Sequence, residues 1–419
     1  MNEKKCFPHV LRYNCWKLQV LHIALSKHGS GTYSPAMTLI TSSKELSDLC
    51  HELAQSDVVT VDTEFLREST YWPKLCLVQV ADANRFAAID VLAPDIDLNP
   101  LFDLMRKPDV LKVFHSARQD LEIFHLLMDE VPHPIFDTQV AAMVCGFGDS
   151  IGYDNLARRL VNVEIDKSAR FADWSRRPLT QKQISYALSD VTYLRDIYAK
   201  LREQIDKSGR EHWLNEEMAI LENPETYRQD PETAWLRLKT RSNDRHYLAI
   251  LKELAAWREI EAQRRDTPRG RVIKDEQLYD VASNRPTNAK DLSKTRGVSV
   301  DMAEGRLGKE ILIAVQKALD LPRKDCPAPK ERTIPNNGLG AIMDLLRVLL
   351  KQSCDEYDVA QKLIANSSDL EKIAADDNAD VKALSGWRRE VFGEKALRLK
   401  KGLIALSIKN GKLVVEDLD

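Results

Sequence analysis

The sequence has no closely spaced cysteines and no long apolar run. Its seven cysteines are scattered along 419 residues and none forms a C-x-x-C pair, so neither a zinc site nor a disulfide framework is indicated. Such a distribution is typical of a reducing, cytoplasmic setting. No apolar run approaches the roughly 18 residues of a membrane span. The sequence therefore predicts no membrane association.

A strong net charge is also lacking. The formal charge is −3 and the pI is near 6.4, so any nucleic-acid binding must come from local basic patches. No Ser-His or Cys-His arrangement suggests a covalent enzyme intermediate. The hydrophobic fraction of 43% is enough for real cores, and the length predicts two to four domains.

The first 36 residues differ from the rest. They contain two cysteines, three histidines and a single arginine, without a sustained hydrophobic period. Polar residues interrupt the apolar core that a signal peptide would need. We therefore expect residues 1–36 to be a mobile or non-native extension, with the functional start at Met37.

Two kinds of pattern follow. Residues 37–235 begin with β-branched strands and continue with alternating helices, including one long helix from about Thr180 to Ile205, which predicts a mixed α/β sheet flanked by helices. The strands then disappear. Residues 241–321 and 339–415 are helical segments of similar size, separated by a Pro- and Gly-rich linker at 322–338. Their similar rhythm suggests a duplicated module.

The segment VVTVDTEF, residues 58–65, is the strongest candidate for a functional strand. Because strand side chains alternate between faces, Asp62 and Glu64 point the same way. Two neighbouring carboxylates repel each other in an apolar setting, and a divalent cation relieves that repulsion. The alternative is a strand end that runs into solvent.

Further carboxylates occur at two later positions. Asp120 opens the helix after the strand VLKVFHS, where it is either a helix cap or a metal ligand at the edge of the sheet. Tyr186 and Asp190 are four residues apart and so share one helix face. They are either a half-buried helix surface or a ligand with a phenol aimed at the same centre.

This order of motifs resembles the DEDD superfamily of 3′-to-5′ exonucleases, in its tyrosine-bearing branch. Several segments read like the bacterial ribonuclease D family, and they cover essentially Met37 to the C-terminus: VDTEFLRESTYWPKLCLVQVAD, VFHSARQDLEIF, FDTQVAA and FADWSRRPLTQKQISYALSDVTYL. The two helical segments resemble paired HRDC modules. The resemblance implies a ribonuclease H-like domain at 37–235 followed by two all-α HRDC domains.

The resemblance also implies a chemistry. Asp62, Glu64, Asp120 and Asp190 would hold two Mg²⁺ or Mn²⁺ ions, which prefer hard oxygen ligands. Two such ions stabilise the attacking and leaving oxygens of a phosphodiester displacement, and Tyr186 would orient the attacking water. The expected substrates are RNA 3′ ends, with precursor tRNA implied by the family and 5′-mononucleotides as products. The alternatives are a DNA-directed exonuclease and a non-catalytic nucleic-acid binding protein. No protein partner can be inferred.

Other residues are weaker candidates for substrate contacts. Phe65 either stacks on the terminal nucleotide or belongs to the core, and His115 either contacts substrate or is structural. Trp174 and Arg177 either clamp the RNA backbone or form a solvated basic turn. Basic clusters in the helical modules either track phosphates or belong to balanced helix surfaces: Arg264, Arg265, Arg269 and Arg271, and Arg388 with Arg389.

Overall fold

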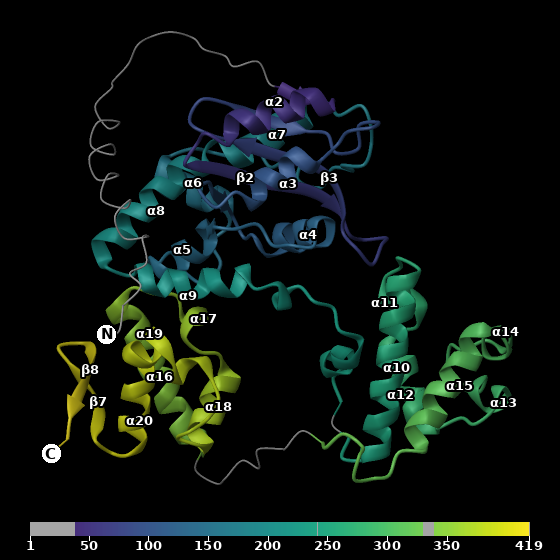
Figure 1. Cartoon of the computed structure of the whole chain (residues 1–419). Coiled ribbons are helices and arrows are strands. Elements are labelled where there is room, and N and C mark those ends of the chain that lie inside the picture. Colours follow the sequence, from purple (N-terminus) through teal and green to yellow (C-terminus); the bar gives the residue numbers. More distant parts are fainter. Residues whose placement is uncertain (1–37, 241, 330–338, 419) are drawn as a thin grey trace, which may run out of the picture. The chain divides into compact units, whose positions relative to one another are not determined.

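The first part of the chain is built around a mixed six-stranded sheet. The computed structural model describes residues 38–240, 242–329 and 339–418, so the predicted extension at 1–36 and most of the linker lie outside the described residues. The sheet order is β1-β4-β3-β2-β5-β6, and Figure 1 shows the neighbouring strands β2 and β3. β3 is antiparallel to β2 and β4, whereas the other neighbouring pairs are parallel. The strands are β1 (Thr38–Ile40), β2 (Val58–Leu66), β3 (Lys74–Ala81), β4 (Phe86–Ile89), β5 (Leu111–Phe114) and β6 (Ile135–Asp137).

Helices cover both faces of this sheet, as the sequence predicts for an α/β domain. They are α2 (Ser43–Leu53), α3 (Asn99–Arg106), α4 (Arg118–Met128), α5 (Thr138–Val144), α6 (Tyr153–Val161), α7 (Gln181–Thr192), α8 (Leu194–Ser208) and α9 (Glu211–Glu222), with 3-10 turns at Pro224–Thr226 and Pro231–Arg237. The single long helix expected from Thr180 is wrong. It is two helices, because the chain turns at Tyr193 and Leu194 starts α8.

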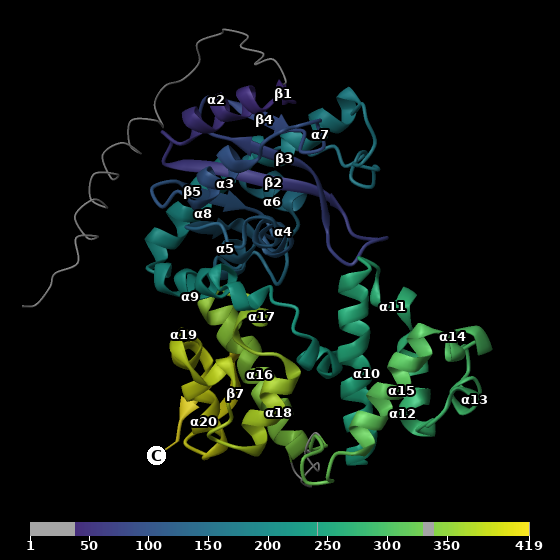
Figure 2. The same cartoon turned by 45° about the vertical axis from the view of Figure 1, so that its right-hand side comes forward.

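The two faces of β2 have different neighbours. Val59 and Val61 point into the main core, whereas Thr60 on the other face donates a hydrogen bond to the carbonyl of Val191 in α7. Both views show α7 beside β2 and β3 (Figures 1 and 2). α7 begins with a capping box in which Thr180 and Gln183 bond each other's backbone, a strong start signal for a helix. The helix is therefore fixed on the face that carries Asp62 and Glu64.

A β-bulge lies beside these carboxylates. The pairing between β2 and β3 shifts between Glu64 and Phe65, since Glu64 lies opposite Leu77 and Phe65 lies opposite Leu75. Cys76 is thus the extra residue on β3. Bulges bend and twist a strand, and they are frequent next to active sites.

The second part of the chain, residues 245–319, is helical, with its own hydrophobic core. We call it the first helical module. Its helices are α10 (Arg245–Arg264), α11 (Arg269–Val272), α12 (Asp275–Asn284), α13 (Ala289–Leu292), α14 (Val300–Glu304) and α15 (Arg306–Leu319).

The third part, residues 339–417, is the second helical module. Its elements are α16 (Leu339–Tyr357), α17 (Gln361–Ile364), α18 (Ser367–Ala375), a 3-10 turn at Lys382–Leu384, α19 (Gly386–Arg388), a π-helical turn at Arg389–Gly393, α20 (Glu394–Lys400), β7 (Ile404–Lys409) and β8 (Lys412–Asp417). The expectation that strands end near residue 235 is wrong, because β7 and β8 form an antiparallel hairpin. The core of this module includes Val144 and Trp213 of the α/β domain. Within the described residues, no helix has the length and apolar character needed to cross a membrane.

Candidate active site

Three carboxylates from two elements meet on the α7 side of the sheet. Asp62 and Glu64 belong to β2, and Asp190 belongs to α7. One carboxylate oxygen from each residue can be chosen so that all three lie within 4.8 Å of one another. The structure thus places the late helix next to the D-x-E strand.

The electrostatics of this group favour a bound cation. Burial and the charge of Asp190 raise the pKa of Asp62 well above its usual value. Burial, with the charges of neighbouring carboxylates, raises the pKa of Glu64 to about 10, and burial raises the pKa of Asp190 to about 7. Ionised together, these groups repel one another unless a cation compensates them. Clustered carboxylate oxygens are ligands that Mg²⁺ and Mn²⁺ prefer, so the residues fit a divalent cation.

Asp120 approaches the same strand from its opposite side. It lies in the first turn of α4 and is only 7% exposed. Its carboxylate accepts a hydrogen bond from the hydroxyl of Thr63, which alternates with Asp62 and Glu64 along β2. Burial and the charge of Asp62 raise the pKa of Asp120. Asp120 is therefore next to the three-carboxylate group without belonging to it in this conformation.

Tyr186 lies one helical turn before Asp190 in α7, so the two side chains share one face of that helix. Burial and the charge of Asp190 raise its pKa, so the phenol keeps its proton at neutral pH. Tyr153 is a second phenol near the group, which the sequence reasoning missed. Its pKa is raised by burial and by the charges of Asp190 and Asp62, but its hydroxyl is bonded to the Ser189 carbonyl at 2.8 Å.

The two single-residue candidates for substrate contact have structural neighbours. Phe65 is half-buried and packs against the main core, as in the core alternative. His115 Nδ1 lies 2.9 Å from Thr138 Oγ1, and its ring lies 5.6 Å from that of Tyr153. Burial lowers the pKa of His115, so the ring is neutral at pH 7. Both positions favour a structural role.

Trp174 and Arg177 are also held within the fold, which neither alternative anticipated. Trp174 is 3% exposed, and its ring lies 6.1 Å from the ring of Tyr186. Arg177 forms a bidentate ion pair with Asp90 at 2.6 Å and donates to the Cys76 carbonyl at 2.8 Å. The exposed aromatic side chain of this segment is Phe171, which is 91% exposed. A backbone clamp formed by Trp174 and Arg177 is therefore not favoured.

Asp137 is a buried carboxylate that the sequence reasoning did not single out. It is 2% exposed and accepts hydrogen bonds from the backbone N–H groups of Ser116 and Ala117 at 3.0 and 2.8 Å. It also caps α5 through the N–H of Gln139 at 2.8 Å. Asp137 therefore fixes the turn that leads into α4 and Asp120. Its only sequence signal was a helix cap position after a short strand.

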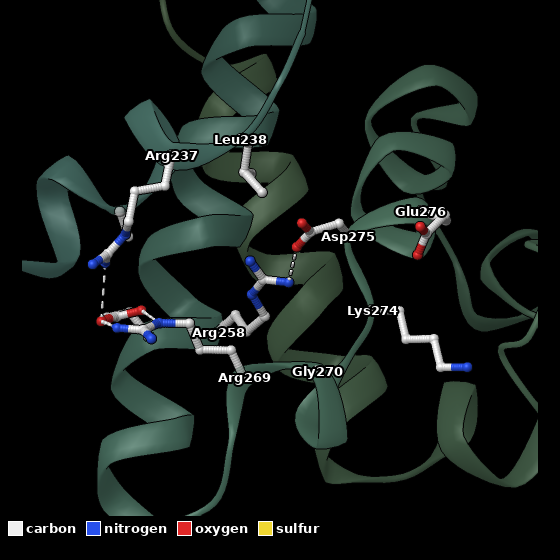
Figure 3. A pocket seen from close by; sticks show the side chains of 10 residues that line it. Arg237, Leu238, Arg258, Arg269, Gly270, Lys274, Asp275 and Glu276 are labelled. Carbon is white, nitrogen blue, oxygen red and sulfur yellow. Dashed lines mark hydrogen bonds and ion pairs between the residues drawn. The ribbon is translucent and has the colours of Figure 1, made fainter. Parts of the chain in front are cut away.

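A separate pocket of about 440 Å³ lies in and beside the first helical module. Figure 3 shows arginines that point toward acidic partners in this pocket. Arg269 and Arg237 bind Glu259, and Arg258 binds Asp275 at 2.6 Å. None of the site carboxylates lines it. These charges are compensated within the chain, so the balanced-surface alternative holds for Arg269.

Matches to two protein-family models define the class of protein to which this chain belongs. Residues 37–206 match the family model described as 3'-5' exonuclease, and residues 247–315 match the HRDC domain. The described fold and the carboxylate group agree with the first match. The protein thus combines a 3′-to-5′ exonuclease domain with an HRDC domain.

The family follows from relatives that cover most of the chain. Ribonuclease D of Granulibacter bethesdensis is 51% identical over 91% of this chain and 96% of its own length, and that of Nitrobacter hamburgensis is 50% identical over 90% and 99%. The structure of Escherichia coli RNase D matches with a TM-score of 0.77 and 30% identity over 87% of this chain and 99% of that one. The chain belongs to the ribonuclease D family and is a 3′-to-5′ exoribonuclease.

Proposed function

We propose that the protein trims the 3′ ends of structured RNAs, precursor tRNA among them, and releases 5′-mononucleotides. The observation that carries the proposal is the group formed by Asp62, Glu64 and Asp190, whose charges act on the nearby phenol of Tyr186. Escherichia coli RNase D is described as an exoribonuclease involved in structured RNA processing, which supports the substrate class.

We propose that Asp62, Glu64 and Asp190 hold divalent cations, two Mg²⁺ or Mn²⁺ ions in all, with Asp120 joining them when it leaves Thr63. Two ions held by these residues would activate a water molecule and stabilise the leaving 3′ oxygen. The side chains of the protein bind the cations and orient the attacking water. Tyr186 keeps its proton and directs the attacking water through its hydroxyl, while β2 and α7 hold the three half-buried carboxylates in place.

The residue assignments are tested with two variants. Asp62→Asn is expected to abolish turnover and leave RNA binding largely intact, because it removes a ligand and not the RNA-binding surface. Tyr186→Phe is expected to slow hydrolysis without loss of metal binding. Parent-like rates in Asp62→Asn would refute the site, and unchanged kinetics in Tyr186→Phe would assign that side chain to packing.

The substrate assignment is tested by comparing matched 3′-tailed RNA and DNA strands and a tRNA with a 3′ extension. The expected result is faster degradation of RNA and removal of the tRNA tail. Preference for the DNA strand would favour the alternative of a DNA-directed exonuclease.

We also propose that residues 339–415 form a second HRDC domain that positions RNA. The support is the order of helix lengths. α10, α11 and α12 have 20, 4 and 10 residues, and α16, α17 and α18 have 19, 4 and 9. Ultraviolet crosslinking of the full chain to a tRNA precursor is expected to label both modules, and label confined to the first would contradict the proposal.

A further inference from the structure

Gln79 is a fully buried amide without a hydrogen-bond partner. It lies near the end of β3 and is 0% exposed. Neither its side-chain oxygen nor its side-chain nitrogen bonds another described group. A buried polar group that is not bonded costs free energy, and native proteins keep few of them. An apolar side chain at this position would avoid that cost. The stability of the fold therefore does not explain a glutamine here.

The strand register places this amide beside the carboxylate centre. Gln79 lies directly opposite Asp62 on β2 and opposite Ala88 on β4. Residues opposite each other in antiparallel strands point to the same face, with Cβ atoms roughly 4.5–5.5 Å apart. A glutamine side chain can therefore reach the carboxylate of Asp62.

Apart from Asp62, the residues directly opposite Gln79 and two positions before it are apolar, while Thr60 and Glu64 lie two positions to either side of Asp62 on the same face. Leu77, two residues before Gln79, and Ala88 belong to a hydrophobic cluster with the buried face of α7. Asp62 is the polar residue that the register places directly opposite the Gln79 amide.

We propose that Gln79 is a positioning residue of the proposed cation site: its amide N–H, which is unpaired in this structure, donates to the Asp62 carboxylate when a cation binds and holds that carboxylate in the binding orientation. The inference rests on the proposed cation site. Carboxylates that bind metals are commonly oriented by such hydrogen bonds from neighbouring residues, and loss of one typically lowers metal affinity by about 10–100-fold.

Gln79→Met tests the inference because methionine has a similar length and no amide donor. Mn²⁺ binding to the full chain is measured without RNA by electron paramagnetic resonance, and stability is measured by urea unfolding of the metal-free protein. We expect Mn²⁺ affinity to fall by about 10–100-fold, whereas the metal-free protein keeps or gains stability. A purely structural glutamine would give the opposite pair of results: lower stability and unchanged Mn²⁺ affinity.

Two further variants separate the possible failures. Leu77→Met, on the same strand and the same face, is an apolar exchange that should leave Mn²⁺ affinity unchanged. Asp62→Asn should weaken Mn²⁺ binding strongly. If the parent protein and Asp62→Asn bind Mn²⁺ equally, the proposed cation site fails. If Asp62→Asn behaves as expected and Gln79→Met binds Mn²⁺ like the parent, the role of Gln79 is overturned.

Discussion

Arg388 offers a sharp test of how the second helical module is attached to the α/β domain. Its side chain is 5% exposed and binds Glu217 and Glu216 of α9. Its Nε atom also donates to the Leu363 carbonyl at 2.6 Å. The neighbouring Arg389 is different, because it is 54% exposed and binds Glu394 at 3.2 Å within its own module. Adjacent arginines thus provide a variant and its control.

The expected loss of folding stability depends on which carboxylate each substitution leaves unpaired. Arg388→Ala leaves Glu217 unpaired with a side chain only 11% exposed, and burial already raises the pKa of that carboxyl. Removal of one partner from a buried ion pair costs about 3–5 kcal/mol. Because Glu216 is 44% exposed, we expect the lower end, about 3 kcal/mol. Arg389→Ala breaks an exposed pair, for which about 0–1 kcal/mol is typical.

Urea unfolding of the full chain, followed by tryptophan fluorescence, measures the difference. The contact contains a suitable reporter, since the rings of Trp213 and Trp387 stack at 4.4 Å with an interplanar angle of 12°. We expect the first unfolding transition of Arg388→Ala to move to lower urea while that of Arg389→Ala stays in place. Equal shifts would refute the argument. So would a loss of RNA affinity in Arg388→Ala without loss of stability, because Arg388 would then contact RNA.

Three other outcomes are expected. The unfolding free energy of the metal-free protein should fall as pH rises from about 4.5 toward 10, because folding raises the pKa of Glu64 and the folded state therefore binds more protons than the unfolded state. Glu64→Gln should make the unfolding free energy depend less on pH. Urea unfolding at several pH values measures this dependence, and an unchanged dependence in the variant would contradict the prediction. Arg177→Ala should lower stability by about 3 kcal/mol by leaving buried Asp90 unpaired, and parent-like unfolding would argue against that pair. Phe171→Ala should keep stability within about 0.5 kcal/mol but weaken binding of single-stranded RNA by about 1–3 kcal/mol if the exposed ring stacks on a base, as fluorescence anisotropy can test.

The carboxylate centre could be predicted because its signals are local and periodic. The alternation of β2 places Asp62 and Glu64 on one face, and helical spacing places Tyr186 and Asp190 on another. The prediction that these two faces meet rested on the resemblance to a known family. Nothing in either segment specifies which other segment it contacts. Asp120 was placed correctly on its helix, but its bond to Thr63 depends on how α4 meets β2, which sequence spacing does not contain.

For the predicted substrate contacts, the structure shows partners within the fold that the sequence did not indicate. Arginine is the usual phosphate ligand, yet the same guanidinium forms bidentate bonds with a carboxylate. Arg177 and Arg388 meet acidic residues that lie 87 and 171 positions earlier in the chain. A cluster of basic residues in the sequence therefore does not show whether its side chains are exposed. Their acidic partners in the folded chain decide that. The β7–β8 hairpin was missed because the helical rhythm of the preceding residues hid two short strands.

The attachment of the second module also bears on the active site, because α9 contacts both. Its first turns carry Trp213 and Glu217, which hold the module. Further along, the sulfur of Met218 accepts the backbone N–H of Asp137 at 3.3 Å. Asp137 in turn fixes the backbone that leads into α4, the helix of Asp120. A shift of α9 would therefore move a residue that positions one of the four carboxylates. In this arrangement the second helical module is connected to Asp120 of the candidate active site by packed side chains. A module that served only as a flexible tether for RNA would leave Asp120 unaffected.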